Sequence, residues 1–157
     1  MNAPILTETE LLGLINDARK QGKSIAFANG IFDLLHVGHV RYLQDASCEA
    51  DVLVVGVNSD DSARALKGEG RPLMTDRERA ELIAAIRGVT YVTIFRDTSP
   101  ARLIAVLQPD VHCKGTDYTA ESVPERAIVL GYGGRVAIVG DPKDHSTTAI
   151  LEKMRGQ

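Results

Sequence analysis

The feature that most restricts the fold is an almost unbroken apolar run, Asp51-Val-Leu-Val-Val-Gly-Val57. A strand with one face in water alternates apolar and polar residues, whereas a strand of a parallel sheet is covered on both faces and is apolar throughout. Shorter runs of strand-forming residues at 24–28, 91–95, 110–113 and 135–139 are separated by segments with helical spacing. This alternation predicts a Rossmann-like, doubly wound α/β fold with a mainly parallel five-stranded sheet and helices on both faces.

Two capping boxes mark the starts of helices. Thr7-Glu-Thr-Glu10 predicts an N-terminal helix that runs to about Gln21-Gly22 and leads into the domain. Thr75-Asp-Arg-Glu78 predicts a second helix that ends near Gly88. Between them, the glycine-rich and basic segment 66–72 is expected to be a mobile loop that closes over an anion.

Composition excludes several classes of partner. A net charge of −3 with no basic block argues against nucleic acid. No apolar run approaches the roughly 20 residues that span a bilayer, and the N-terminus lacks the basic start of a signal peptide, so we expect a cytoplasmic protein with no membrane partner. A hydrophobic content of 44% suits one globular domain over residues 1–157, with 1–22 as its leading helix.

The strongest chemical signal follows the strand expected at 24–28. His36 and His39 lie three residues apart at the expected start of a helix, and Gly38 removes a side chain that would block the helix N-terminus. Backbone N–H groups and the helix dipole attract phosphate there, and two imidazole donors strengthen such a site. Surface or capping histidines are the plainer interpretation. A zinc pair is another, but no further zinc ligands follow at compatible spacing.

Other anion-binding candidates lie further along the chain. Lys67 is either a solvated loop lysine or a cation that reaches a bound phosphate. Ser146, Thr147 and Thr148 offer hydroxyls and backbone N–H groups at another helix N-terminus, where a single one would suffice as an ordinary cap. The sequence contains neither the phosphate loop G-x-x-x-x-G-K-[ST] nor the dinucleotide turn G-x-G-x-x-G, which weighs against P-loop and nicotinamide chemistry.

Gly30-Ile-Phe-Asp33 followed by His36-Val-Gly-His39 resembles the cytidylyltransferase-like nucleotidyltransferase superfamily, whose members carry a His-x-Gly-His motif. The resemblance implies an enzyme in which a phosphate-bearing substrate attacks the α-phosphate of a nucleoside triphosphate and releases pyrophosphate. The residues that it assigns to catalysis are His36, His39, Lys67 and Arg79. Arg79 lies near the position where the superfamily has a phosphate-contacting arginine, so the resemblance implies that it contacts phosphate. Those expected to bind the nucleotide are Asn29, Gly30, Ile31, Phe32, Asp33, Gly38, Lys114, Gly115, Asp117, Ser146, Thr147 and Thr148.

Within the superfamily, several segments are similar to those of the adenylyltransferases that make ADP-heptose from heptose 1-phosphate. These segments are 29–33, 57–60, 66–68 with 71–72, 114–118 and 146–148. The similarity implies transfer of AMP from ATP to a sugar 1-phosphate, with Mg²⁺ on the triphosphate, and it leaves a homodimer open. The alternatives are a glycerol-3-phosphate cytidylyltransferase or other CTP-using relative and, from another class, a nucleotide-binding module without turnover.

One segment departs from the wider superfamily. Glycerol-3-phosphate cytidylyltransferases carry an arginine shortly before the Ser/Thr signature, where this chain has Asp141-Pro-Lys-Asp-His145. Lys143 could replace that arginine in part, and His145 could donate to a phosphate. The departure favours ATP over CTP.

Overall fold

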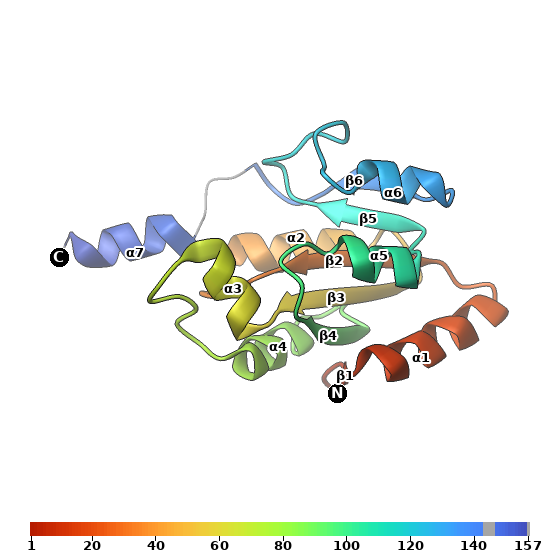
Figure 1. The fold of residues 1–157 in the computed structure, drawn as a ribbon, viewed down its shortest axis with the longest axis horizontal. Helices are drawn as coiled ribbons and strands as arrows, with labels where there is room; N and C mark the ends of the chain where they lie inside the picture. The colour runs from red at the N-terminus through yellow and green to blue at the C-terminus, as the bar shows by residue number, and fades with distance from the viewer. Residues whose placement is uncertain (143–146, 157) are drawn as a thin grey trace.

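The computed structural model describes residues 1–142 and 147–156, without the side chain of Thr147. Within these residues, one parallel sheet has six strands in the order β1-β4-β3-β2-β5-β6. The strands are β1 (Ile5–Leu6), β2 (Ile25–Gly30), β3 (Val52–Asn58), β4 (Tyr91–Phe95), β5 (Val111–Lys114) and β6 (Arg135–Ile138). The helices are α1 (Glu8–Lys20), α2 (Val37–Ser47), α3 (Asp60–Lys67), α4 (Asp76–Ala84), α5 (Ala101–Leu107), α6 (Arg126–Gly131) and α7 (Thr147–Arg155) (Figure 1).

The predicted doubly wound, parallel α/β fold is confirmed, but the predicted number of five strands is wrong, because the sheet has six. The additional strand, β1, has two residues and pairs with β4 through Ile5 and Val92. It lies between Pro4 and Thr7, the residue that caps α1. A strand of two residues shows no periodicity, so no sequence pattern could have revealed it.

The two faces of the sheet carry different halves of the core. Ala26 and Ala28 of β2 pack with α2 and α4, whereas Ile25 and Phe27 pack with α1, α5 and α6. The helix residues in these clusters are Leu43, Ala46, Ala80, Ile83 and Ala84 on the first face, and Leu11, Ile15, Ala18, Leu103, Ile104, Leu107 and Val129 on the second. Every residue of β3 is buried, which accounts for the apolar run predicted to be its strand.

The strand order reverses direction at β2. Strands β3, β4 and β1 follow on one side of it, and β5 and β6 follow on the other. β2 pairs with β3 at six residue positions, but with β5 at only two, Ala26 with Val111 and Phe27 with His112. In open parallel sheets, ligands bind outside the carboxyl ends of the strands at such a switch point.

Two helices differ from prediction. α3 was not predicted, and Lys67 is its last residue instead of part of a loop; Ser59 caps the start of this helix, and Gly68, with φ 93°, follows its end. α4 starts at the predicted capping box of Thr75, but it ends at Ala84, ahead of the predicted stop. The glycines of segment 66–72 favour a loop over the whole segment. In the structure, a helix of only eight residues reaches Lys67 before the first of these glycines.

Gly88 connects α4 to β4 with φ 100°, a conformation that L side chains rarely adopt. A Cβ on Gly88 would lie 2.5 Å from Ser47 Oγ on α2. We expect Gly88→Ala to lower the free energy of unfolding by about 2–4 kcal/mol, because overpacking adds to backbone strain. Gly133→Ala is the control, since its φ is 92° and no described atom lies within 4 Å, so strain alone should cost about 1–2 kcal/mol. Urea unfolding measures both, and equal losses would contradict the packing argument.

Candidate active site

A cavity of about 370 Å³ opens at the carboxyl edge of the sheet, beside the switch point. Its walls come from the loop after β2, the start of α2, the end of α3 with the loop that follows, the loop after β5, the segment after β6 and the start of α7. The lining residues are Asn29, Gly30, Ile31, Phe32, Asp33, His36, Gly38, His39, Tyr42, Lys67, Arg71, Lys114, Gly115, Thr116, Asp117, Tyr118, Val139, Gly140, Asp141, Pro142 and Thr148.

Most of the residues predicted for the site therefore meet in one cavity. Among the described predicted residues, Arg79 does not line it. Thr148 does, so the start of α7 contributes to the site. Ser146, Lys143 and His145 lie outside the described residues, as does the side chain of Thr147.

His36 and His39 stack on each other at the N-terminus of α2, with ring centroids 3.8 Å apart. His36 Nδ1 accepts the backbone N–H of Gly38 at 3.1 Å, and His39 Nδ1 accepts the backbone N–H of His36 at 3.3 Å. Because Nδ1 is an acceptor in both rings, each neutral imidazole carries its proton on Nε2. The pair thus caps the helix through Nδ1 and offers Nε2–H as its donor, so the capping and anion-binding interpretations are compatible.

Phe32 packs against the second histidine. Its ring meets His39 edge to face, with centroids 5.3 Å apart and planes at 77°. Phe32 has φ 52°, unusual for a bulky residue, and a Cβ on Gly30 would lie 2.9 Å from Phe32 Cζ. Gly30 is therefore needed for the close approach of the Phe32 ring, which in turn packs against the His39 ring.

Asp33 holds the segment between α3 and α4 through three donors. Its carboxylate accepts Arg71 Nε at 2.5 Å, the backbone N–H of Leu73 at 2.7 Å and that of Met74 at 3.3 Å. Arg71 lines the cavity, although the sequence analysis assigned it no role there. The basic character of segment 66–72 was the available signal, but Lys67 alone was selected from it.

Lys67 and Lys114 bring positive charge to the cavity from two different elements. Lys67 comes from α3, and Lys114 ends β5. Burial lowers the pKa of the Lys114 ammonium, an effect that the carboxylates of Glu125 and Asp117 oppose. Lys114 Nζ also lies 4.5 Å from the centroid of the Tyr118 ring, a cation–π contact.

Asn29 is oriented by a histidine that the sequence analysis missed. His112 on β5 is fully buried, and burial, followed by the charge of Lys114, lowers the pKa of its imidazole to about 3. Its Nε2 lies 3.2 Å from Asn29 Oδ1, which can only accept, so neutral His112 donates through Nε2–H. The amide group of Asn29 is then its donor toward the cavity. Contacts between neighbouring strands leave no signal in a single sequence.

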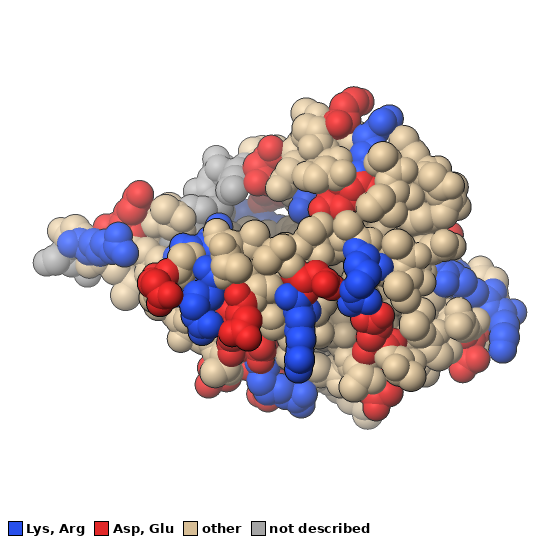
Figure 2. All heavy atoms as spheres, in the orientation of Figure 1, with Lys and Arg blue, Asp and Glu red and all other residues tan. Residues whose placement is uncertain are grey.

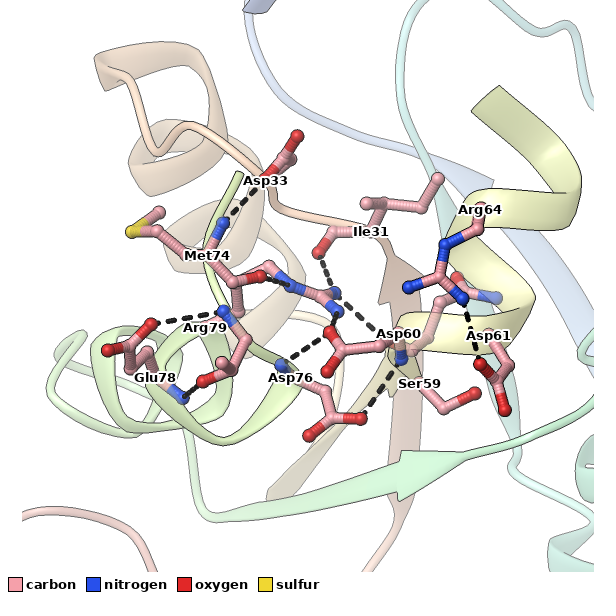
Figure 3. Close-up of polar contacts among 12 residues, drawn as sticks. Ile31, Asp33, Ser59, Asp60, Asp61, Arg64, Met74, Asp76, Glu78 and Arg79 are labelled. Carbon is pink, nitrogen blue, oxygen red and sulfur yellow. Dashed lines mark hydrogen bonds and ion pairs between the residues drawn. The ribbon is translucent and has the colours of Figure 1, made fainter. Parts of the chain in front are cut away.

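Arg79, predicted to contact phosphate, lies behind the cavity wall. Its side chain is 0% exposed, and four protein oxygens accept its hydrogen bonds (Figure 3). These are Met74 O at 3.0 Å from Nε, Ile31 O at 2.7 Å and Asn58 O at 2.8 Å from Nη1, and Asp60 Oδ1 at 2.9 Å from Nη2. A direct contact with phosphate would require some of these bonds to break.

The surface carries charges of both signs. On the face shown in Figure 2, Lys and Arg side chains are interspersed with Asp and Glu, so positive charge is not concentrated over that face. Within the described part of the chain, no helix combines the length and apolar character needed to cross a bilayer. Positive charge for an anion is instead supplied locally, by the lysines and Arg71 of the cavity.

The fold and the site together place the chain among the Rossmann-like α/β proteins that bind a ligand at the carboxyl edge of a parallel sheet. The sequence profile of the family described as Cytidylyltransferase-like matches residues 27–153. The chain belongs to the cytidylyltransferase-like family, which confirms the membership predicted from the His-x-Gly-His motif.

Curated relatives are longer than this chain. It is 51% identical over 144 residues to the bifunctional protein HldE of Geobacter metallireducens, a match that covers 92% of this chain and 29% of that protein. The HldE protein of Geotalea uraniireducens is 49% identical over 154 residues, covering 98% and 31%. The chain thus spans less than a third of these relatives. A solved structure, the lipopolysaccharide core biosynthesis protein from Thermoplasma volcanium, has 27% identity and a TM-score of 0.63, covering 75% of this chain and 95% of that one.

Proposed function

We propose that the chain transfers AMP from ATP to a sugar 1-phosphate, specifically heptose 1-phosphate, giving ADP-heptose and pyrophosphate. The observation that carries the proposal is the stacked His36–His39 pair, which shares one cavity with Lys67 and Arg71. The similarity to a lipopolysaccharide core biosynthesis protein supports a sugar phosphate as substrate. The HldE relatives are bifunctional proteins, and the chain spans less than a third of their length. The chain would then carry one of two activities.

The chemistry needs positioning and charge stabilisation more than proton removal. A sugar 1-phosphate is already an anion at neutral pH, so its oxygen can attack the α-phosphorus without a general base. The Nε2–H groups of His36 and His39 would donate to the α-phosphate as negative charge develops there. Lys67 and Arg71 would bind the oxygens of the departing pyrophosphate or of the attacking phosphate.

Mg²⁺ is assigned to the nucleotide. The described residues contain no group of three or more metal-ligating side chains, and the oxygens of Asp33 are already used by Arg71 and by the backbone N–H groups of Leu73 and Met74. Mg²⁺ commonly keeps several waters and binds through substrate phosphates. The ion would therefore neutralise triphosphate oxygens, and the cavity residues would bind the complex.

Pyrophosphate release tests the proposal. ATP, Mg²⁺ and a panel of sugar phosphates are mixed with the protein, and heptose 1-phosphate is expected to react fastest, with hexose 1-phosphates as controls. Calorimetric binding of ATP, without release of its pyrophosphate in the presence of any of the sugar phosphates, would instead identify a nucleotide-binding module without turnover.

ATP should be used in preference to CTP, with kcat/KM higher by at least about tenfold, a ratio that modest differences in pocket contacts can supply. The motivation is segment 114–118, which lines the cavity, together with the absence of an arginine in Asp141-Pro-Lys-Asp-His145. The measurement compares both nucleotides with the same sugar phosphate. A preference for CTP would assign the chain to the glycerol-3-phosphate cytidylyltransferases or to another CTP-using branch.

The proposal also covers location and partners. A cytoplasmic site follows from ATP as donor, and the net charge of −3 supports small anionic substrates bound by local cations over nucleic acid. Sedimentation of the purified chain would distinguish a homodimer from a monomer.

A further inference from the structure

The guanidinium of Arg79 joins three segments that converge on the cavity. Ile31 follows β2 and lines the cavity, Asn58 ends β3, and Met74 lies between α3 and α4. The backbone carbonyl of each accepts from this one planar group, and Figure 3 shows the contacts with Ile31 and Met74. Because the donors of a guanidinium have a fixed geometry, the relative positions of the three segments depend on a single side chain.

The same group fixes the start of α3. Asp60 Oδ1 accepts from Arg79 Nη2 and also from the backbone N–H of Asp76, at 2.8 Å. In return, Asp76 Oδ2 accepts the backbone N–H of Asp60 at 3.0 Å (Figure 3). The N-termini of α3 and α4 therefore cap each other through two carboxylates, one of which is paired with Arg79.

The contacts of Arg79 with Asp60 and with Met74 connect it to two cations of the cavity, Lys67 and Arg71. Asp60 is the first residue of α3, and Lys67 is the last, so a helix fixed at its start carries Lys67 at its other end. Met74 is three residues from Arg71, whose Nε binds Asp33. Moving either the start of α3 or the Met74 carbonyl would displace one of the two cations.

We propose that Arg79 is a positioning residue, which sets where Lys67 and Arg71 lie relative to His36 and His39 and does not itself contact the substrate. The inference rests on the proposed function, in which those two cations bind phosphate oxygens. It assigns Arg79 a role distinct from the phosphate contact expected from the sequence. It also accounts for a fully buried cation so close to an anion-binding cavity, because the carbonyls and Asp60 compensate the charge.

Arg79→Lys tests the role through catalysis. Lysine keeps the charge but lacks the planar fork, so it cannot bind all four acceptors together. We expect kcat to fall by about 10²-fold, as for a misplaced catalytic group, with a smaller change in KM for ATP. Arg19→Lys is the matched control, because the Arg19 guanidinium also binds two backbone carbonyls, those of Leu107 and Gln108, remote from the cavity. It should keep the wild-type kcat. Assays are run well below the unfolding midpoints of both variants.

A double-mutant cycle separates positioning from general structural damage. If Arg79 acts by placing Lys67, then Lys67→Ala should reduce kcat less in the Arg79→Lys background than in the wild type. Independent, multiplicative losses would overturn the proposal. Asp60→Asn, which keeps an oxygen at the same position, is the milder second variant should Arg79→Lys fold poorly.

Nuclear magnetic resonance of the arginine Nε–H groups tests the absence of substrate contact without any variant. On addition of inorganic pyrophosphate to the wild-type chain, the Arg71 signal should move and the Arg79 signal should stay in place. An Arg79 signal that moved as far as that of Arg71 would overturn the inference. This experiment requires no turnover, so it tests the role of Arg79 even in a protein that releases no pyrophosphate. Absence of pyrophosphate release from the wild type would refute the proposed function. A wild-type kcat in Arg79→Lys, with an active wild type, would refute only the inference.

Discussion

His36→Asn and His39→Asn should each lower kcat by at least about 10²-fold, because the loss of one preorganised donor to developing charge typically costs about 2.7–4 kcal/mol of barrier. Asparagine is the informative replacement, since its Oδ1 can take the place of Nδ1 as a cap acceptor. The hydrogen bonds to the Gly38 and His36 backbone N–H groups are then retained, while the donor at the Nε2 position is lost. Steady-state kinetics with ATP and the sugar phosphate give the ratio.

His36→Gln is the matched control for the first histidine. A glutamine amide nitrogen can approach the position of Nε2, so this variant should retain more activity than His36→Asn. Thermal unfolding should be nearly unchanged in the asparagine variants, whereas alanine at either position would also remove a cap worth about 0.5–2 kcal/mol. Near-normal turnover in folded His36→Asn and His39→Asn would remove the pair from the mechanism.

Lys67→Ala should reduce kcat by about 10²-fold and raise the dissociation constant for ATP by much less. In the free chain Lys67 is exposed at the end of α3, so its ammonium is well solvated. With the triphosphate bound, the same charge would face phosphate oxygens in a site shielded from water, where its effect on the developing charge is larger. Calorimetry of ATP binding and single-turnover rates separate the two effects.

Arg64→Ala is the control for this change. Arg64 lies on the same helix and forms an exposed ion pair with Asp61, at 3.0 Å, so it tests the loss of a positive charge from α3 without a change in the cavity. It should leave both quantities close to wild type. A Lys67→Ala variant that bound ATP far more weakly, but reacted at the wild-type rate once saturated, would show that Lys67 serves ground-state binding.

The fold was largely predictable because its signals are local. The apolar run at 51–57 and the capping boxes at Thr7 and Thr75 act through neighbouring residues, and the helices and strands that they predict are present. β1 and α3 were missed because two strand residues, or one short helix ahead of glycines, carry too little periodic pattern.

The residues that line the site were largely predictable from segments along the chain, but the contacts that support them were not. His36 and His39 lie three residues apart at the start of one helix, so their spacing already placed them together. The supporting contacts join segments far apart in sequence: His112 with Asn29, and Arg79 with Ile31. A single sequence does not show that Arg79 points into the protein. An arginine that binds phosphate and a buried arginine that connects backbone segments can occupy the same helical position.

The strand order has a consequence for how substrate preference can change in relatives of this chain. The histidines, Lys67 and Arg71 belong to the β1–β4 side of the molecule, and Lys114 and Thr148 belong to the side that begins after β4. The two sides meet where β2 and β5 share only two paired positions, against six between β2 and β3. A small lateral shift along this seam would widen or narrow the cavity if it kept or replaced the hydrogen bonds that cross the seam, from Tyr42 to the Cys113 carbonyl and between His112 and Asn29. New substrates could thus be accommodated by drift of one half-sheet, with the reacting residues left untouched.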